Sequence, residues 1–313
     1  MTIAYISHPD CLLHDMGPEH PECPARLHAI QDHLVARGIE LVLRHYDAPL
    51  ATEEQLCRVH DRAYLERLSA ESPTEGLHWI DGETGMCPGT LRAAYRAAGA
   101  AVHGVDLVMR GEATSAFCAV RPPGHHAGRS RAGGFCFFNN VAVGAAHALA
   151  EHGLERVAIC DFDAHHGDGI EEIFRDDPRV LYCSSFEHPA YPYAGADTGG
   201  EHLVNVPLKA GTDGRAFRRA VADAWFDRMA AFAPQMVLVS AGFDGHAEDD
   251  MTRLVLGDDD FRWVSCEIKR VADASAGGRV VSVLEGGYSL SALGRGVAAH
   301  IDALLGNKHG AHP

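Results

Sequence analysis

Short apolar runs alternate along the chain with longer segments of helical periodicity. The runs are rich in residues that favour strands, and their length suits strands buried inside a sheet. They span 3–6, 41–43, 116–120, 157–160, 180–183, 236–239 and 280–284. Helical patterns cover 90–109, 141–152, 214–232 and 259–274. This alternation predicts an α/β fold with a mostly parallel sheet and helices on both faces.

The alternation runs through all 313 residues without a linker rich in Pro, Ser or Gly and without a block of like charge. We therefore expect one domain over residues 1–313, in which 306–313 form a polar C-terminal tail. The content of 46% hydrophobic and 7% aromatic residues is typical of globular proteins with a large core.

The formal net charge of -16 argues against direct binding of nucleic acid, because phosphate binding needs basic surfaces. This charge is compatible with a cationic substrate, although an acidic surface can also serve only to keep a protein soluble.

Nine scattered cysteines without a Cys-x-x-Cys pair predict a reducing compartment. The sequence has no signal-peptide pattern and no apolar run long enough to span a membrane, which predicts a cytoplasmic protein without membrane insertion. Assembly into a homo-oligomer stays open.

Polar clusters follow the carboxyl ends of four predicted strands. They span 121–126, 161–168, 240–246 and 285–288. In open α/β sheets, ligands bind just outside the carboxyl ends of the strands. We therefore expect the four clusters to converge on one site.

Asp163 and His165 are separated by one residue, so in an extended segment both side chains point to the same side. With Asp244 they form a set of one imidazole and two carboxylates, which suits zinc, while iron, cobalt and manganese use the same ligand types. Three protein ligands leave positions open for water and substrate, as a catalytic metal site requires. Taken by itself, Asp244 fits equally well as a cap of the turn after Gly242.

The adjacent His125 and His126 can point in different directions and so perform separate proton transfers. Asp161 and Asp168 are available to orient the two imidazoles. Tyr288 follows two glycines, and its hydroxyl could stabilise the oxyanion of a tetrahedral intermediate. A tyrosine in such a position is, however, more often a packing residue.

Five motifs carry these residues. They are Arg-Pro-Pro-Gly-His-His-Ala (121–127), Gly-Gly-Phe-Cys-Phe-Phe-Asn-Asn (133–140), Asp-Phe-Asp-Ala-His-His-Gly-Asp-Gly (161–169), Ser-Ala-Gly-Phe-Asp (240–244) and Leu-Glu-Gly-Gly-Tyr (284–288). In this order they closely resemble the histone deacetylase family, which includes bacterial deacetylase-like amidohydrolases and acetylpolyamine amidohydrolases. The last two motifs are more similar to the class II branch of that family. The resemblance extends from about residue 8 to about residue 305.

The resemblance implies an arginase/deacetylase fold with an eight-stranded sheet. It also implies a zinc-dependent amidohydrolase that releases acetate and a free amine from an acetylated amine such as acetyl-lysine. One zinc ion would be held by Asp163, His165 and Asp244. His125 and His126 would transfer protons, paired with Asp161 and Asp168 respectively, and Tyr288 would polarise the amide carbonyl.

The resemblance also implies residues for the tunnel and for further sites. Gly134 and Phe135 would line an acyl-lysine tunnel, with Tyr193 as its opposite wall, and Asp81 or Glu83 would anchor the substrate. A structural potassium site would use Asp161, the backbone of Asp163 and His165, Ser184 and Ser185. Arg26 would lie near an internal cavity through which acetate leaves.

Substrate choice stays open. Asp250 replaces a proline that is usual in the loop after Gly-Phe-Asp, and Met251 stands where polyamine-selective relatives carry a glutamate. An acetyl-lysine or small-amide deacylase is therefore favoured over an acetylpolyamine amidohydrolase. Two other classes are a binuclear manganese ureohydrolase, which needs ligands for a second metal, and a non-catalytic acyl-lysine binding module. Tyr288 and the tandem histidines disfavour the binding module, because a binding module needs no proton transfer.

Overall fold

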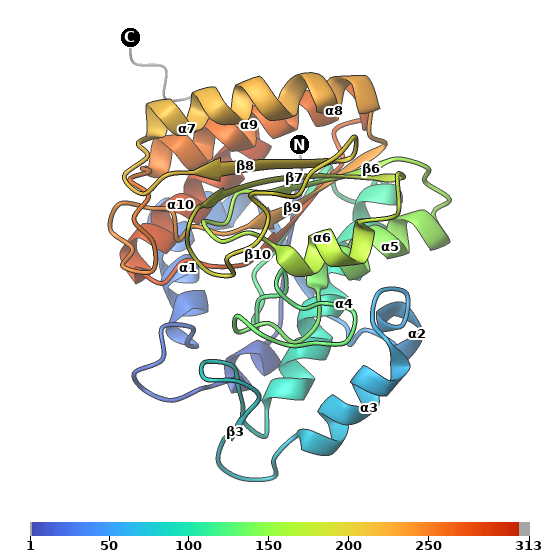
Figure 1. Cartoon of the computed structure of the whole chain (residues 1–313), viewed down its shortest axis with the longest axis vertical. Helices are drawn as coiled ribbons and strands as arrows, with labels where there is room; N and C mark the ends of the chain where they lie inside the picture. The colour runs from blue at the N-terminus through green and yellow to red at the C-terminus, as the bar shows by residue number, and fades with distance from the viewer. Residues whose placement is uncertain (1, 307–313) are drawn as a thin grey trace.

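A parallel sheet forms the centre of the computed structural model, which describes residues 2–306 (Figure 1). Within that range the sheet has eight strands in the order β2-β1-β5-β10-β9-β6-β7-β8. Every neighbouring pair is parallel. The strands are β1 (Ile3–Ser7), β2 (Leu43–Asp47), β5 (Ser115–Cys118), β6 (Val157–Asp161), β7 (Val180–Glu187), β8 (Leu203–Leu208), β9 (Met236–Ala241) and β10 (Val280–Leu284). The predicted α/β fold with a parallel sheet is confirmed.

Within the eight-stranded sheet, the two errors in strand placement both fall on the edge strands. The run at 41–43 predicts a strand, but Ile39–Val42 form a 3-10 turn (η2) and β2 begins at Leu43. No apolar run predicts β8, in which Asn205 and Pro207 interrupt the apolar residues and only three of the six positions are buried. Only strands that are covered on both faces need a continuous apolar sequence, so an edge strand lacks that signal.

Helices cover both faces of the sheet (Figure 1). On one face lie α4 (Thr90–Met109), α5 (Asn140–Glu151) and α6 (Asp168–Phe174). On the other lie α1 (Ala25–Ala36), α7 (Gly214–Val221), α8 (Asp227–Phe232), α9 (Asp258–Ser275) and α10 (Leu290–Leu304). The short α2 (Glu53–Leu56), α3 (Arg62–Glu71) and the hairpin of β3 (His78–Trp79) and β4 (Gly85–Met86) extend the α4 side. A 3-10 turn, η1 (Pro9–Leu13), follows β1.

The predicted helices at 90–109, 141–152 and 259–274 match α4, α5 and α9 closely. The predicted helix at 214–232 is interrupted by a π-helical turn, η3 (Ala222–Phe226). Trp225 and Phe226 lie in this turn and both are buried. Such a turn shifts the helical register by one residue, which a periodic pattern over 19 positions does not reveal.

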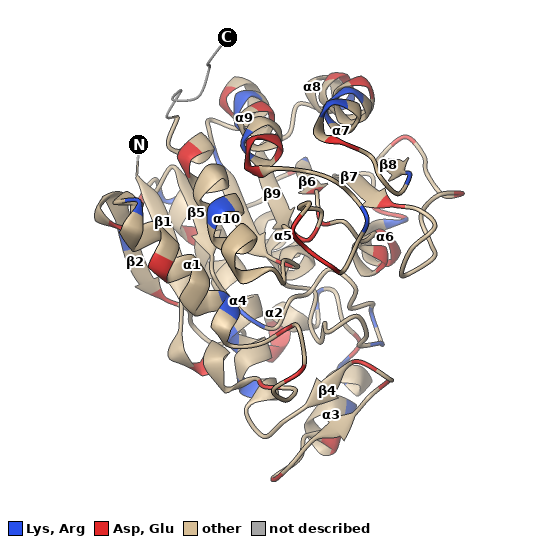
Figure 2. Cartoon of the chain, turned by 90° about the vertical axis from the view of Figure 1, so that its left-hand side faces the viewer, with Lys and Arg blue, Asp and Glu red and all other residues tan. Residues whose placement is uncertain are grey.

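Charged residues are mixed over the surface. Figure 2 shows Lys and Arg interspersed with Asp and Glu over helices and loops. Among the described residues, no helix combines the length and apolar content that crossing a bilayer requires. Residues 307–313, most of the predicted polar tail, lie outside the described part of the chain, and Gly306 follows the end of α10.

Helix α4 packs closely on the sheet because most of its buried face is alanine and glycine. A Cβ atom at Gly104 would lie 2.9 Å from Cγ1 of Val281 in β10. A Cβ atom at Gly99 would lie 2.0 Å from the carbonyl oxygen of Pro49. The small side chains therefore set the distance between α4 and its neighbours.

We expect Gly99→Ala to lower the free energy of unfolding by about 2 kcal/mol, as overpacking of a core does. The gain in helix propensity of about 1 kcal/mol cannot compensate, because the clashing atom belongs to the backbone. In the control Gly144→Ala, the nearest atom is the flexible Cδ2 of Leu238 at 3.0 Å, and we expect little change. Urea unfolding of both variants tests this, and a Gly99→Ala variant as stable as the native chain would contradict it.

Candidate active site

The four polar clusters meet at the carboxyl ends of β5, β6, β9 and β10. These strands are consecutive in the sheet, in the order β5-β10-β9-β6. The chain leaves all four strands at the same edge because they are parallel. Segments that are more than 100 residues apart in the sequence, such as 161–168 and 285–288, thereby become neighbours.

Asp163, His165 and Asp244 form a buried group in which one ligand atom of each residue lies within 4.8 Å of the others. Backbone N–H groups fix both carboxylates. Oδ2 of Asp163 accepts from Gly286 at 2.8 Å. Oδ1 of Asp244 accepts from Ala164 at 2.9 Å, so this aspartate binds the β6 loop and does not cap its own turn.

The donor set fits a divalent cation. Nδ1 of His165 lies 3.1 Å from Oδ1 of Asp163 and 2.8 Å from Oδ2 of Asp244. Oδ2 of Asp244 is nevertheless buried and has no hydrogen-bond partner among the described residues. Burial and the adjacent charge of Asp163 raise the pKa of Asp244 to about 6. A cation between the three side chains would offset this repulsion and give the unpartnered oxygen a ligand bond.

At two glycines the absence of a side chain leaves space for the carboxylates of Asp163 and Asp244. A Cβ atom at Gly242 would lie 2.0 Å from Oδ2 of Asp163. A Cβ atom at Gly286 would lie 2.4 Å from Oδ2 of Asp244 and 2.6 Å from Oδ2 of Asp163. Any side chain at these positions would displace the carboxylates, because the backbone approaches them closely.

His125 and His126 lie beside this group, each with its own aspartate. Nδ1 of His125 donates to Oδ2 of Asp161 at 3.1 Å, and Nδ1 of His126 donates to Oδ1 of Asp168 at 2.8 Å. The two ring centroids are 4.0 Å apart. Nε2 of His125 is 3.9 Å from Oδ1 of Asp163, and the His126 ring lies 6.1 Å from the His165 ring.

The surroundings shift the pKa values of the two imidazoles in opposite directions. Burial opposes the charged form of His125, but the carboxylates of Asp163 and Asp161 outweigh it and raise the pKa of His125 to about 10. Burial and the neighbouring charge of His125 lower the pKa of His126 to about 3. These shifts favour the charged form of His125 and the neutral form of His126, whose Nε2 is free to accept a proton.

Arg131 supports the His126–Asp168 pair, and the sequence analysis missed it. Its guanidinium donates to Oδ2 of Asp168 at 2.6 Å, to Oε2 of Glu172 at 3.1 Å and to the carbonyl of His126 at 3.2 Å. Burial alone would raise the pKa of Asp168, but His126 and Arg131 lower it to about 2. Arg131 lies in a loop outside any periodic pattern, and Asp168 is 37 residues away, so the sequence alone does not indicate that the two are partners.

A cavity of about 410 Å³ leads to these groups. His126, His165 and Tyr288 line it together with Gly134 and Phe135. The backbone turns sharply here, with Gly134 at φ 55° and Phe135 at φ 67°, a region that non-glycine residues seldom adopt. This turn directs the Phe135 ring toward the Tyr288 ring, with the ring centroids 5.9 Å apart and the rings edge to face.

Two tyrosines line the cavity at different depths. Tyr193 lines the cavity but is 75% exposed, which places it at the rim. Tyr191, which the sequence analysis did not select, lies deeper, with its ring 5.0 Å from the His126 ring and 6.2 Å from the His165 ring. A stretch with two aromatic residues and two prolines between 189 and 193 gives no local indication of which ring faces inward.

Of three other predicted substrate residues, two line the cavity. Glu83 and Met251 line it. Oδ1 of Asp81 instead accepts the N–H groups of Glu83 and Thr84, at 2.9 and 2.6 Å, and so caps their turn. Of the two alternatives for anchoring a substrate, Glu83 is the one that reaches the cavity.

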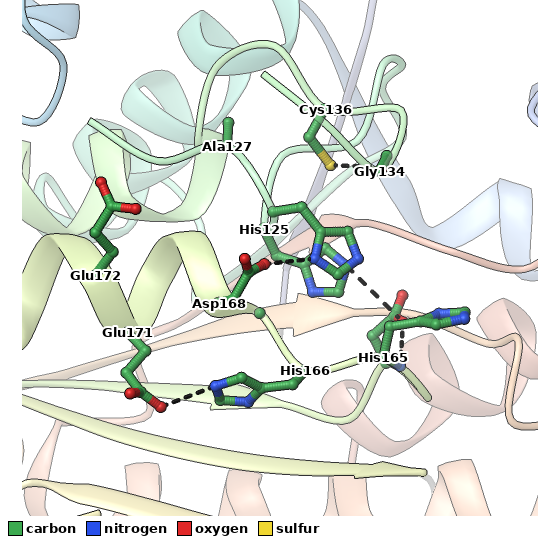
Figure 3. Close-up of polar contacts among 12 residues, drawn as sticks. His125, Ala127, Gly134, Cys136, His165, His166, Asp168, Glu171 and Glu172 are labelled. Carbon is green, nitrogen blue, oxygen red and sulfur yellow. Dashed lines mark hydrogen bonds and ion pairs between the residues drawn. The ribbon is translucent and has the colours of Figure 1, made fainter. Parts of the chain in front are cut away.

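The residues predicted for a potassium site are neighbours. Asp161 in β6 pairs with Ser184 in β7, and the buried Oγ of Ser185 has no partner among the described residues. Oγ of Ser184 lies 3.0 Å from Nδ1 of His166, whose Nε2 is bound by Glu171 at 2.8 Å. Figure 3 shows His166 directed at Glu171 and away from His125. The adjacent His165 and His166 therefore have different partners: His165 belongs to the group with Asp163 and Asp244, and His166 binds Ser184 and Glu171.

Arg26 is buried behind Tyr288, with its guanidinium carbon 4.9 Å from the centre of the Tyr288 ring. Its Nε donates to the carbonyl of Gly287 at 2.7 Å, and its NH1 binds Glu22 at 3.1 Å. The predicted contribution of Arg26 to an exit cavity stays a prediction.

Asp106, His147 and His152 form a second group of potential ligands, with both Nε2 atoms within 2.9 Å of Oδ1 of Asp106. Arg58 donates to Nδ1 of His147 at 2.9 Å. Because Nδ1 is then the acceptor, Nε2 of the neutral imidazole carries the proton and donates to Asp106. This arrangement is a hydrogen-bond network and does not fit a metal ion.

Comparisons with known proteins agree on one family. A family model described as histone deacetylase domain matches residues 20–304. The chain is 38% identical over 278 residues to a histone deacetylase-like amidohydrolase of Pseudomonas aeruginosa, covering 87% of this chain and 72% of that protein. It is 36% identical over 301 residues to a probable deacetylase of Archaeoglobus fulgidus, covering 93% and 82% respectively.

Two further matches extend the comparison. The chain is 37% identical over 328 residues to polyamine deacetylase HDAC10 of Mus musculus, which covers 98% of this chain but 49% of that protein. The crystal structure of the HDA15 HD domain superimposes with a TM-score of 0.90 at 30% identity, covering 99% of this chain and 89% of that one.

We expect Gly286→Ala to abolish tight binding of one divalent ion, because the added methyl group would displace both carboxylates. The control is Gly200→Ala, at a position where a Cβ atom meets nothing within 4 Å. Zinc content after dialysis against a weak chelator, measured by elemental analysis, tests the prediction. Equal zinc content in both variants would mean that these carboxylates do not hold the ion.

Proposed function

This chain belongs to the histone deacetylase family, as its motifs predicted, and on that premise we propose that it is a zinc-dependent hydrolase of N-acetylated amines. The observation that carries the proposal is the meeting of three metal-type ligands, two His–Asp pairs and Tyr288 at the end of one cavity. Hydrolysis of the amide would give acetate and a free amine.

Asp163, His165 and Asp244 would hold the zinc ion. When bound, such an ion supplies Lewis-acid chemistry, which polarises a carbonyl group and makes water a stronger acid. A monovalent cation of the potassium type, held by Asp161, Ser184, Ser185 and the backbone of Asp163 and His165, belongs to the same proposal.

The side chains around the ion divide the proton transfers between them. His126 is neutral, and its Nε2 would take a proton from the attacking water and later give it to the leaving amine. His125, whose Nδ1 donates to Asp161, would stabilise negative charge as it develops. The Tyr288 hydroxyl would donate a hydrogen bond to the carbonyl oxygen as that oxygen becomes an oxyanion.

The cavity supports a cationic substrate with a slender acyl end. Gly134, Phe135 and Tyr191 form its inner walls, and Glu83 and Asp250 line its mouth. Acidic groups at the mouth would attract an acetylated amine that carries a positive charge elsewhere, such as an acetylpolyamine or acetyl-lysine in a basic peptide.

All nine cysteines lie in the described residues and are free, which supports a reducing, cytoplasmic setting.

We expect Tyr288→Phe and His126→Ala each to lower kcat on an acetyl-lysine peptide by about 10²- to 10³-fold while zinc content stays near one per chain. Tyr46→Phe, whose hydroxyl has no partner and lies on β2 away from the site, is the control. Acetate release and elemental analysis give both readings. Native turnover in either variant would remove that residue from the mechanism.

We expect Glu83→Gln to raise KM for acetylputrescine by about 2- to 5-fold at low salt, the effect of one partly exposed charge, and to leave kcat unchanged. KM for an uncharged N-acetylated amine should not change. The difference should shrink in 1 M salt because charges at the mouth are screened. The same KM increase for the charged and the uncharged substrate would mean that Glu83 acts by shape and not by charge.

A further inference from the structure

Asp249 lies in the loop between β9 and α9 and is only 5% exposed. Its Oδ2 accepts the backbone N–H of Tyr288 at 2.6 Å and that of Ser289 at 2.9 Å. Its Oδ1 accepts the N–H of Met251 at 3.1 Å. One carboxylate thereby joins the backbone of Tyr288 to the loop that lines the mouth of the cavity.

The chain that leads to Tyr288 does not fix the position of this tyrosine by itself. Gly286 and Gly287 precede it, and Gly287 adopts φ 123°, a conformation that glycine leaves at little cost. The N–H groups of residues 288 and 289 also lie ahead of the first turn of α10, which begins at Leu290. An external acceptor is therefore needed to hold this backbone in place.

Two side chains contact the faces and edges of the Tyr288 ring without binding its hydroxyl. Phe135 contacts it edge to face at 5.9 Å between ring centres, and the Arg26 guanidinium lies 4.9 Å from its centre. Neither contact is a directional bond to the phenol. In the described part of the chain, Asp249 takes part in no ion pair, so its carboxylate is balanced by backbone N–H groups alone.

We propose that Asp249 is a positioning residue, which anchors the Tyr288 backbone so that the phenol hydroxyl faces the carbonyl oxygen of the substrate. This inference rests on the proposed function of Tyr288. Asp249 itself does not line the cavity, in contrast to its neighbours Asp250 and Met251. Its effect on the reaction is therefore expected to pass through Tyr288.

A double-mutant cycle on the zinc-loaded full chain tests the inference. Asp249→Ala and Asp249→Asn are made in the native chain and in Tyr288→Phe, and kcat and KM are measured with an acetyl-lysine peptide. In the native chain, Asp249→Ala should lower kcat by about 10-fold or more with KM changed by less than about 3-fold. In the Tyr288→Phe chain, the same change should lower kcat by less than about 2-fold, because the hydroxyl to be positioned is absent.

The conservative variant should rescue most of the loss. The single amide oxygen of Asp249→Asn can still accept from both Tyr288 and Ser289, so its kcat should fall by only about 2- to 5-fold, and again only when the hydroxyl is present. If Asp249→Ala does not fold, the comparison of Asp249→Asn in the native chain and in Tyr288→Phe provides the test. Asp177→Ala is the matched control, because that carboxylate accepts the N–H of Arg179 at the opposite end of the sheet.

Equal fold losses of kcat in the two backgrounds would overturn the inference, because Asp249 would then act independently of the hydroxyl. Native kcat in Asp249→Ala would also overturn it. Both results leave the proposed function intact as long as Tyr288→Phe alone is impaired. Full turnover in Tyr288→Phe alone would instead remove the tyrosine from the proposed function and the inference with it.

Discussion

Two carboxylates buried side by side are the constraint on which the rest of the site depends. Asp163 and Asp244 lie at the ends of adjacent strands, with no lysine or arginine among the described residues to pair with them. Charges of the same sign cannot remain together in a dry interior without compensation. Backbone N–H groups from Gly286 and Ala164 supply part of it, and the imidazole of His165 supplies more. Oδ2 of Asp244 lies near His165 but has no hydrogen-bond partner among the described residues, and a cation at this oxygen would complete the balance.

Acidic side chains around this centre act largely as acceptors for the backbone of the active-site loops. Glu285 accepts the N–H groups of Gly124 and His125, at 2.6 and 3.1 Å, and so fixes the loop that carries both histidines. Asp249 does the same for Tyr288. Asp161 and Asp168 hold the imidazoles themselves. Some of the acidic residues therefore stabilise loop conformations. The irregular backbone of these loops leaves N–H groups without a backbone acceptor, and the carboxylates accept them.

Much of the fold and of the site can be predicted from sequence. Buried central strands such as β6 and β10 are continuous apolar runs, because helices cover both of their faces. Asp161 ends β6, and Asp163, His165 and Asp168 follow within seven residues, so all four are found together by proximity in the sequence alone. The edge strands β2 and β8 face solvent in part, so their patterns were misplaced or missed. Arg131, Tyr191 and Asp249 escaped notice because each acts on a partner that lies far away in the sequence or on another loop.

By itself, the sequence determined the family, the α/β class with its central buried strands, and the residue types that gather at the carboxyl edge of the sheet. These are properties of local patterns, since periodicity and short motifs follow from the bonding of neighbouring residues. The tertiary structure alone decided which tyrosine faces inward, which acidic residue reaches the cavity, and which carboxylate holds the backbone of Tyr288. Such choices depend on loop conformations at glycines and at strained positions such as Phe135, where the energy is set by the packing of distant segments.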